Sequence, residues 1–195
     1  GGLTDIGEYA EVVGEVSQYQ AGDLLTVSSE ISGKFQKSDL VSQHNLAGVV
    51  SETAGLVAGG GDETITYDEK GKPTNRIIIA LAGRVPVKVS LENGPIKIGD
   101  RLTSSSTTGM AMKATKDGQT IGIALESFDG SVQTSNGTTV SKTGKVLTFI
   151  NLGYSKFDPQ LSTATTTDNW IVDQQTGRIQ SQYTLDMNSR DIINV

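Results

Sequence analysis

The chain has 195 residues, a formal net charge of −6 and no cysteine. Nucleic-acid binding requires clustered lysine and arginine, so this acidic balance argues against a nucleic-acid partner. The absence of cysteine excludes disulfides and thiolate zinc sites. No apolar run approaches the roughly 18 residues of a membrane span, and no signal peptide opens the sequence, so we expect no membrane insertion.

The composition favours short strands over helices. Hydrophobic residues make up 35% of the chain and aromatic residues 5%, whereas there are 23 glycines and 41 serines and threonines. Glycine and β-branched residues form helices poorly, but they suit strands joined by tight turns. The sequence therefore predicts an all-β protein.

Three segments in the first half of the chain predict strands. Residues 8–29 alternate loosely between apolar and polar, and residues 46–52 and 76–92 are apolar runs bounded by turn-forming residues. Within the last run, residues 77–82 are apolar on both faces, which predicts a central strand. Pro86 in the same run predicts an edge position or a bulge, because proline lacks a backbone N–H.

Other segments predict connections. Residues 67–73 and 129–145 are polar and glycine-rich, which is typical of hairpin tips. A short helix is expected over residues 38–45.

The stretch NGPIKIGDRLTSSSTTGMAMKA (93–114) has a fainter copy earlier in the chain. Ten positions match between the two copies, at offsets that drift from 77 to 76 and then 74. Four of the matching pairs are turn positions: Gly22/Gly99, Asp23/Asp100, Gly33/Gly109 and Gly48/Gly122. The other six pairs are Leu25/Leu102, Thr26/Thr103, Ser28/Ser105, Ser29/Ser106, Lys37/Lys113 and Glu52/Glu126. The sequence thus predicts an internal duplication, with copies at about 15–56 and 92–130.

Each copy can be explained as one β unit. Gly-Asp makes a tight turn into a strand, because glycine tolerates positive φ and the carboxylate accepts a backbone N–H. The leucine that follows would enter the core, and the serine-rich tip would turn the chain back. Two such units, neither able to bury its own face, would combine into one β-barrel or sandwich of the β-clip type over residues 1–153.

The last part of the chain has a different character. Residues 154–169 contain few core-forming residues and predict a linker, whereas residues 170–195 alternate again around Trp170. This tail is too short to fold alone, so we expect it to form β-prism or β-helix layers that continue into further sequence. Because the chain opens on Gly1 and ends within an apolar alternation, we expect it to be a piece of a longer protein.

The hydroxyl run offers candidate nucleophiles. Ser104, Ser105 and Ser106 would need a positioned base, and His44 is the single histidine. No Gly-x-Ser-x-Gly elbow accompanies these residues, so a β-turn explains the run better than a Ser-His-acid triad does. We expect no catalytic residues.

Metal, phosphate and sugar sites are weakly indicated. Asp62-Glu63 and Asp68-Glu69 lack the spacing of a calcium loop, and residues 56–63 lack the Lys-Ser/Thr ending of a phosphate loop. Glu52 and Glu126 occupy matching repeat positions, which leaves a carboxylate pair across a pseudo-twofold axis open. Asn136 fits a glycosylation sequon, and Trp170 with Tyr183 could form a sugar platform. We expect neither a metal nor a cofactor.

Several sequence segments resemble known phage and bacterial surface proteins. DIGEYAE, GDLLTVSS, AGVVSETAGLVAGG, ALAGRVPVKVSLENGPIKIGDRLTSSSTTGMAMKA and IGIALESFDG resemble a β-rich domain of phage tail-fibre or appendage proteins and bacterial surface proteins. The domain is similar to peptidase G2, the intramolecular-chaperone autoproteolytic domain of phage appendages. The duplicated Gly-Asp-x-Leu unit also looks like phage capsid decoration proteins, and LDMNSRDIINV resembles a phrase that is common in fibre proteins.

The resemblance implies a structural role. We expect a non-catalytic knob or spacer of an extracellular, cell-surface or virion fibre, assembling as a homo-oligomer, commonly a homotrimer. Two alternatives stay open: a self-cleaving maturation domain, and a carbohydrate-binding adhesin with surface glycans or other fibre proteins as partners. The resemblance implies that self-cleavage would use acidic residues near the cut, but it maps no such residue onto this chain.

Overall fold

The computed structural model describes residues 5–134, 137–156, 170–172 and 179–181. The chain divides into two compact units, Gly1–Lys156 and Phe157–Val195. In the second unit the described residues form one antiparallel strand pair, β13 (Trp170–Val172) and β14 (Ile179–Ser181). The expected β-prism or β-helix layers otherwise lie outside the described residues.

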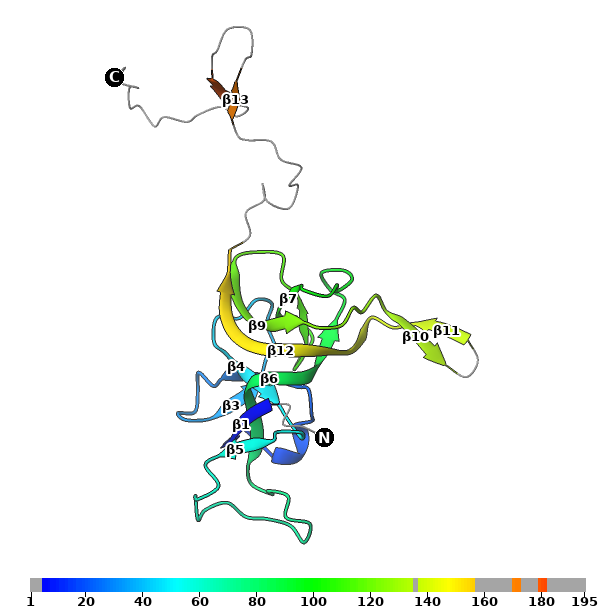
Figure 1. Cartoon of the computed structure of the whole chain (residues 1–195). Helices are drawn as coiled ribbons and strands as arrows, with labels where there is room; N and C mark the ends of the chain where they lie inside the picture. The colour runs from blue at the N-terminus through cyan, green and yellow to red at the C-terminus, as the bar shows by residue number, and fades with distance from the viewer. Residues whose placement is uncertain (1–4, 135–136, 157–169, 173–178, 182–195) are drawn as a thin grey trace, which may run out of the picture. The chain divides into compact units, whose positions relative to one another are not determined.

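The regular secondary structure of the first unit is almost entirely β-strand, which confirms the all-β prediction (Figure 1). Its strands are β1 (Asp5–Ala10), β2 (Leu24–Val27), β3 (Phe35–Lys37), β4 (Leu46–Val50), β5 (Leu56–Ala58), β6 (Ile77–Ser90), β7 (Arg101–Ser104), β8 (Ala111–Lys113), β9 (Gly118–Ala124), β10 (Ser131–Thr134), β11 (Gly137–Val140) and β12 (Thr143–Ser155). A single 3-10 turn, η1 (Val16–Gln18), is the helical element among the described residues.

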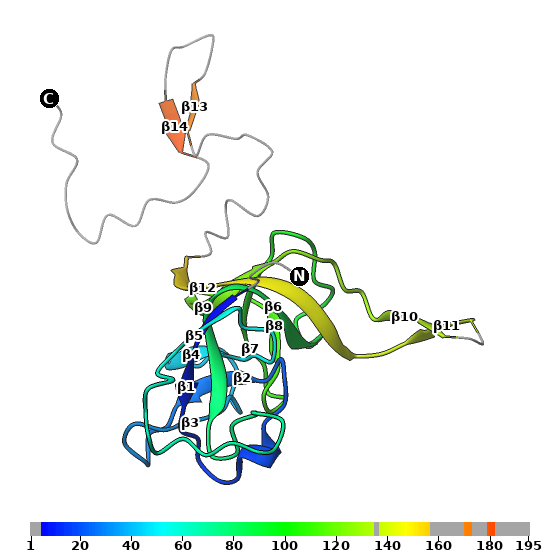
Figure 2. The same ribbon diagram turned by 60° about the horizontal axis from the view of Figure 1, so that its bottom comes forward.

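Five strands close into a ring. The hydrogen-bonded order β12-β9-β7-β8-β6 is completed by a further pairing of β12 with β6. From β6 the same sheet continues through β4 and β2 to β3, while β1 lies along the first half of β6 and carries β5 on its other side. β12 curves across the body, and hairpin β10–β11 extends away from it in both views (Figures 1 and 2).

The two sequence copies have the same strand register. In the first copy Leu25 pairs with Gly48 on β4 and with Lys37 on β3. In the second copy Leu102 pairs with Gly122 on β9 and with Lys113 on β8. A long strand then follows each copy in the sheet, since β4 pairs with β6 and β9 pairs with β12. The repeated residues are therefore the ones that set the hydrogen-bond register of a three-stranded unit.

The main core lies between the two copies. Leu24, Val49, Leu102 and Ile121 have no exposed surface and belong to one cluster with the inward residues of β6 and β12. A smaller cluster around Leu25 and Ile79 lies under β1. Because each copy contributes to the same main core, neither could bury its apolar face alone.

The central-strand prediction is confirmed, since residues 77–82 pair with β1 on one side and β4 on the other. Pro86 pairs only with β12 among the described strands, opposite Leu147, so its missing N–H breaks no ladder on the other side. The hairpin at 129–145 is confirmed as β10–β11, and the turn at 67–73 is closed by a bridge between Tyr67 and Pro73.

The helix expected over residues 38–45 is wrong. This segment is a loop in which Ser42 has a φ of 52°. The backbone N–H of Ser42 donates to the Ser104 carbonyl (2.9 Å), and that of Gln43 donates to Ser104 Oγ (2.8 Å). These N–H groups are used by the second copy and are not available for helical hydrogen bonds.

Candidate functional site

The first Gly-Asp turn is built around a buried carboxylate. Asp23 Oδ1 lies 2.6 Å from Lys88 Nζ, and Asp23 Oδ2 lies 2.9 Å from Lys37 Nζ. Oδ2 also accepts the backbone N–H of Gln20 at 2.9 Å, which closes the turn. The Tyr19 ring lies 5.6 Å from Lys37 Nζ. Two lysines thus converge on one carboxylate that is 1% exposed.

The second Gly-Asp turn repeats part of this arrangement. Asp100 Oδ2 lies 3.2 Å from Lys113 Nζ and accepts the backbone N–H of Lys97 at 2.8 Å. Lys113 matches Lys37 of the first copy, but no lysine corresponds to Lys88 in the described contacts of Asp100. The Asp100 side chain is 22% exposed, so its ion pair is the more solvated of the two.

The surroundings of Asp23 shift its titration. Burial raises the pKa of this carboxyl, but hydrogen bonds from Lys88, Lys37 and the Gln20 backbone outweigh burial and hold the pKa below its usual value of 3.8. The pKa of Tyr19 is raised by burial and by the negative charge of Asp23. These hydrogen bonds therefore favour the ionised form of the Asp23 carboxylate, which makes it a charged anchor for the turn.

The repeat glycines serve two purposes. Gly22 and Gly99 begin the turns with φ of 93° and 91°, which only glycine adopts readily. Gly48 and Gly122 lie where another strand passes closely. A Cβ on Gly48 would be 2.6 Å from the Ala80 carbonyl oxygen, and one on Gly122 would collide with the Phe149 carbonyl oxygen.

The remaining pair closes the serine-rich tips. Gly33 and Gly109 have φ of 75° and 70°. Gly33 is exposed, whereas Gly109 is buried against the first copy: it donates to the Ser38 carbonyl at 2.7 Å and accepts the Leu24 N–H at 2.8 Å. The tip of the second copy thus rests beside the Asp23 cluster.

The hydroxyl run holds turns together. Ser104 and Ser105 are fully buried, so this part of the serine-rich tip does not face solvent. Ser105 Oγ lies within hydrogen-bond reach of the Met110 carbonyl (3.1 Å), and exposed Ser106 donates to Glu92 Oε2 (2.8 Å). His44 is exposed and has no hydrogen bond to these serines in the described part of the chain. The structure therefore does not assemble a Ser-His pair.

The acidic candidates are used locally. Asp62 caps its own turn through Thr64, and Asp68 Oδ1 accepts the backbone N–H groups of Lys70 and Lys72. Glu52 pairs with Lys72 at 3.3 Å, whereas Glu126 accepts the Leu147 N–H, so these two carboxylates make different contacts. No group of three or more metal-binding side chains was found among residues 5–134 and 137–156 or the two short strands beyond.

The aromatic and glycan candidates lie almost entirely outside the described residues. Asn136 and Tyr183 lie outside the described residues, and of Trp170 only the strand is described. In the described part of the chain no helix is long and apolar enough to span a membrane.

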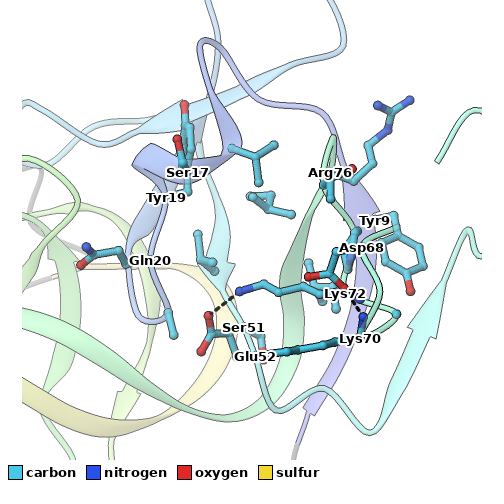
Figure 3. A pocket seen from close by; sticks show the side chains of 18 of the residues that line it. Tyr9, Ser17, Tyr19, Gln20, Ser51, Glu52, Asp68, Lys70, Lys72 and Arg76 are labelled. Carbon is cyan, nitrogen blue, oxygen red and sulfur yellow. Dashed lines mark hydrogen bonds and ion pairs between the residues drawn. The ribbon is translucent and has the colours of Figure 1, made fainter. Parts of the chain in front are cut away.

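A pocket of about 1020 Å³ lies between η1, the end of β4 and the segment that leads into β6 (Figure 3). Its apolar lining includes buried Val50 and Ile77. Figure 3 shows Lys72 reaching across to Glu52, with Tyr19 and Gln20 on one side and Tyr9 on the other.

Cations outnumber carboxylates around this pocket. The lining contains four cationic and two acidic side chains, namely Lys70, Lys72, Arg76, Lys145, Glu52 and Asp68. Lys72 is paired with Glu52, and Arg76 lies 2.9 Å from Glu11. Lys70 and Lys145 form no ion pair within the described residues. The pocket lining therefore combines apolar residues with more cationic than acidic side chains, on a chain that is acidic as a whole.

Sequence reasoning missed two long-range contacts. Lys88 lies outside both copies, and nothing local marks it as a partner of Asp23. Gln119 bonds both the N–H (2.9 Å) and the carbonyl (3.2 Å) of Leu46, so one side chain substitutes for a strand partner between the copies. The pocket was missed as well, because its lining residues are scattered over five segments.

The first unit is thus an all-β domain with a closed ring of strands, in which two segments of similar sequence share one strand register and each contains an Asp-Lys ion pair. No family model matches the chain, and no curated protein matches it.

Two solved structures share this fold. One is the pre-mature gene product 12 of bacteriophage phi29, which is 18% identical with a TM-score of 0.52 and matches 77% of this chain and 22% of that one. The other is a C-terminal fragment of gene product 12, which is 19% identical with a TM-score of 0.50 and matches 75% of this chain and 100% of the fragment. The chain thus spans about a fifth of the pre-mature protein. At these identities the similarity shows the fold alone.

Proposed function

We propose that the chain is a non-catalytic structural module, a knob or spacer, of a phage-type virion appendage or fibre, and that it assembles as a homotrimer. The observation that carries the proposal is the fold shared with the whole C-terminal fragment of a bacteriophage protein. The peptidase G2 and capsid-decoration resemblances stay predictions.

The hydrogen bonds and ion pairs of the candidate site residues support a structural role. The hydroxyls of Ser104, Ser105 and Ser106 are engaged in turns, and Asp23 is held as a charged anchor. A nucleophile needs a base within hydrogen-bond reach, and the hydroxyls of Ser104 and Ser105 have no side-chain base there in the described residues. Ser106 donates to Glu92 Oε2 at 2.8 Å, but this contact lies exposed at the surface.

Immunogold electron microscopy tests the location. Antibodies raised against the 195-residue chain should label a fibre or appendage on virions or surface preparations from the source of the gene. Label confined to the cell interior, with none on particles or on the cell surface, would overturn the proposal.

A second candidate is a self-cleaving maturation domain of a fibre or appendage protein. It is favoured by one observation, namely that the matched phi29 structures are a pre-mature form and a C-terminal fragment of the same gene product. Mass spectrometry of the full-length precursor decides it. One defined internal cut that is lost on mutating a nearby Asp or Glu supports cleavage, and an intact precursor after prolonged incubation contradicts it.

A further inference from the structure

The loop between β3 and β4 sets the first copy apart from the second. Ten residues separate Lys37 from Gly48, whereas eight separate Lys113 from Gly122. The longer loop carries Asp39 and the apolar residues Leu40 and Val41. We call the segment 39–41 the apolar tip. Leu40 is 63% exposed and Val41 51%, and the second copy has no counterpart to this pair. Adjacent exposed apolar side chains are typical of a surface that meets a partner.

Several hydrogen bonds hold the loop around the apolar tip. Ser42, directly after it, adopts a φ of 52°, which is strained for a residue other than glycine. Fully buried Ser104 fixes this conformation by accepting from the N–H groups of Ser42 and Gln43. The Gln43 side chain accepts from the Asp39 N–H (3.0 Å) and donates to Asp39 Oδ1 (3.1 Å). A tip fixed in this way loses little conformational entropy when it binds.

The pocket described above has complementary chemistry. Its lining includes apolar Val50 and Ile77, which suit Leu40 and Val41. The lining also includes Lys70 and Lys145, which form no ion pair within the described residues and suit Asp39. No residue of the apolar tip lines the pocket of its own chain, so the two surfaces are separate patches.

We propose that the apolar tip of one copy inserts into this pocket of a neighbouring copy. The contact joins unlike patches and is therefore heterologous, so repeating it closes a ring or extends a filament. Three copies related by a closing rotation give the homotrimer. This inference rests on the proposed homo-oligomer and names the surfaces that form it.

Matched variants of the full chain test both patches. Leu40→Ser/Val41→Ser removes the apolar tip, and Lys70→Glu/Lys145→Glu reverses two charges in the pocket lining. Each should raise the dissociation constant for self-association at least tenfold in sedimentation equilibrium, with an unchanged circular dichroism spectrum. The controls are Val140→Ser, which alters another exposed apolar residue, and Lys116→Glu/Lys142→Glu, which reverses two exposed lysines outside the pocket. The controls should assemble like the parent chain.

Mixing the two variants separates this contact from any symmetric one. The tip variant keeps its pocket and the pocket variant keeps its tip, so an equimolar mixture should form a one-to-one heterodimer and stop there. A contact between like patches would not be restored by mixing. No heterodimer, or full assembly by either variant alone, overturns the inference.

The homo-oligomer and the tip-to-pocket contact can be tested separately. If the parent chain is oligomeric and both variants keep its mass, the tip-to-pocket contact is wrong and the homo-oligomer stands. If the parent chain is monomeric at every concentration, the homo-oligomer and this contact both fail.

Discussion

Asp23 and Asp100 occupy matching turns, yet their electrostatic surroundings differ. Both accept a backbone N–H three residues earlier in the chain and both pair with a lysine from the next strand of their copy. Only Asp23 gains a second lysine, Lys88 from β6, and only Asp23 is covered by the tip around Gly109. The duplication therefore supplies an internal control, in which the same turn exists in a buried and in a more solvated form.

Replacing Asp23 should cost more stability than replacing Asp100. Asp23→Ala leaves Lys37 and Lys88 without their common carboxylate, and breaking a buried pair costs about 3–5 kcal/mol. Asp100→Ala breaks a partly exposed pair, for which about 1 kcal/mol or less is expected. Urea unfolding followed by circular dichroism gives both free energies. Equal losses would contradict the burial argument.

The stability of the first unit should fall in acid through Asp23. Its pKa in the folded protein is below the usual 3.8, so its contribution is complete above that value and is lost as the pH falls through the lower folded pKa. The free energy of unfolding of Asp23→Asn should therefore change less with pH between about pH 4 and about pH 2 than that of the parent chain. Identical pH profiles would show that this carboxyl is not linked to folding.

At the scale of strands, Gly48 and Gly122 allow two pairs of neighbouring strands to pack closely, because neither residue has a Cβ. Gly48 lets β4 approach β6, and Gly122 lets β9 approach β12. Gly122→Ala should lower the free energy of unfolding by about 1–3 kcal/mol, because its Cβ meets the β12 backbone. Gly118→Ala, in the same strand, has no heavy atom within 4 Å of the added Cβ and serves as the control. Thermal melting of the two variants makes the comparison, and matching melting temperatures would contradict the account.

The loop between β3 and β4 should depend on the second copy. Ser104→Ala removes the acceptor of the Gln43 N–H, at a cost of about 0.5–1.5 kcal/mol for the lost part-buried hydrogen bond. Hydrogen exchange of the amides of residues 39–43 should become faster, while exchange in β9 stays slow. Unchanged protection of the Gln43 amide would show that Ser104 does not hold the loop.

Short-range features of the sequence predicted the repeated elements well. The turn glycines, Leu25 and Leu102 all follow from local rules, because turn chemistry and strand alternation extend over only a few residues. Lys88 and Gln119 act across more than 60 residues, so no local pattern reveals them. The helix expected at 38–45 failed for the same reason, because its backbone donors are taken by Ser104.

At the scale of the whole molecule, the ring of β12, β9, β7, β8 and β6 unites material from both halves of the first unit. Shared core residues from both copies explain why a duplicated unit forms one domain. Ser104, one of the candidate nucleophiles, lies at the contact between the copies.

The mass of the chain in solution tests the central claim most directly. Light scattering coupled to size exclusion should give a single species of three times the 20.5 kDa chain mass. A strict monomer over the whole accessible concentration range would contradict the account of this chain as a self-assembling fibre module.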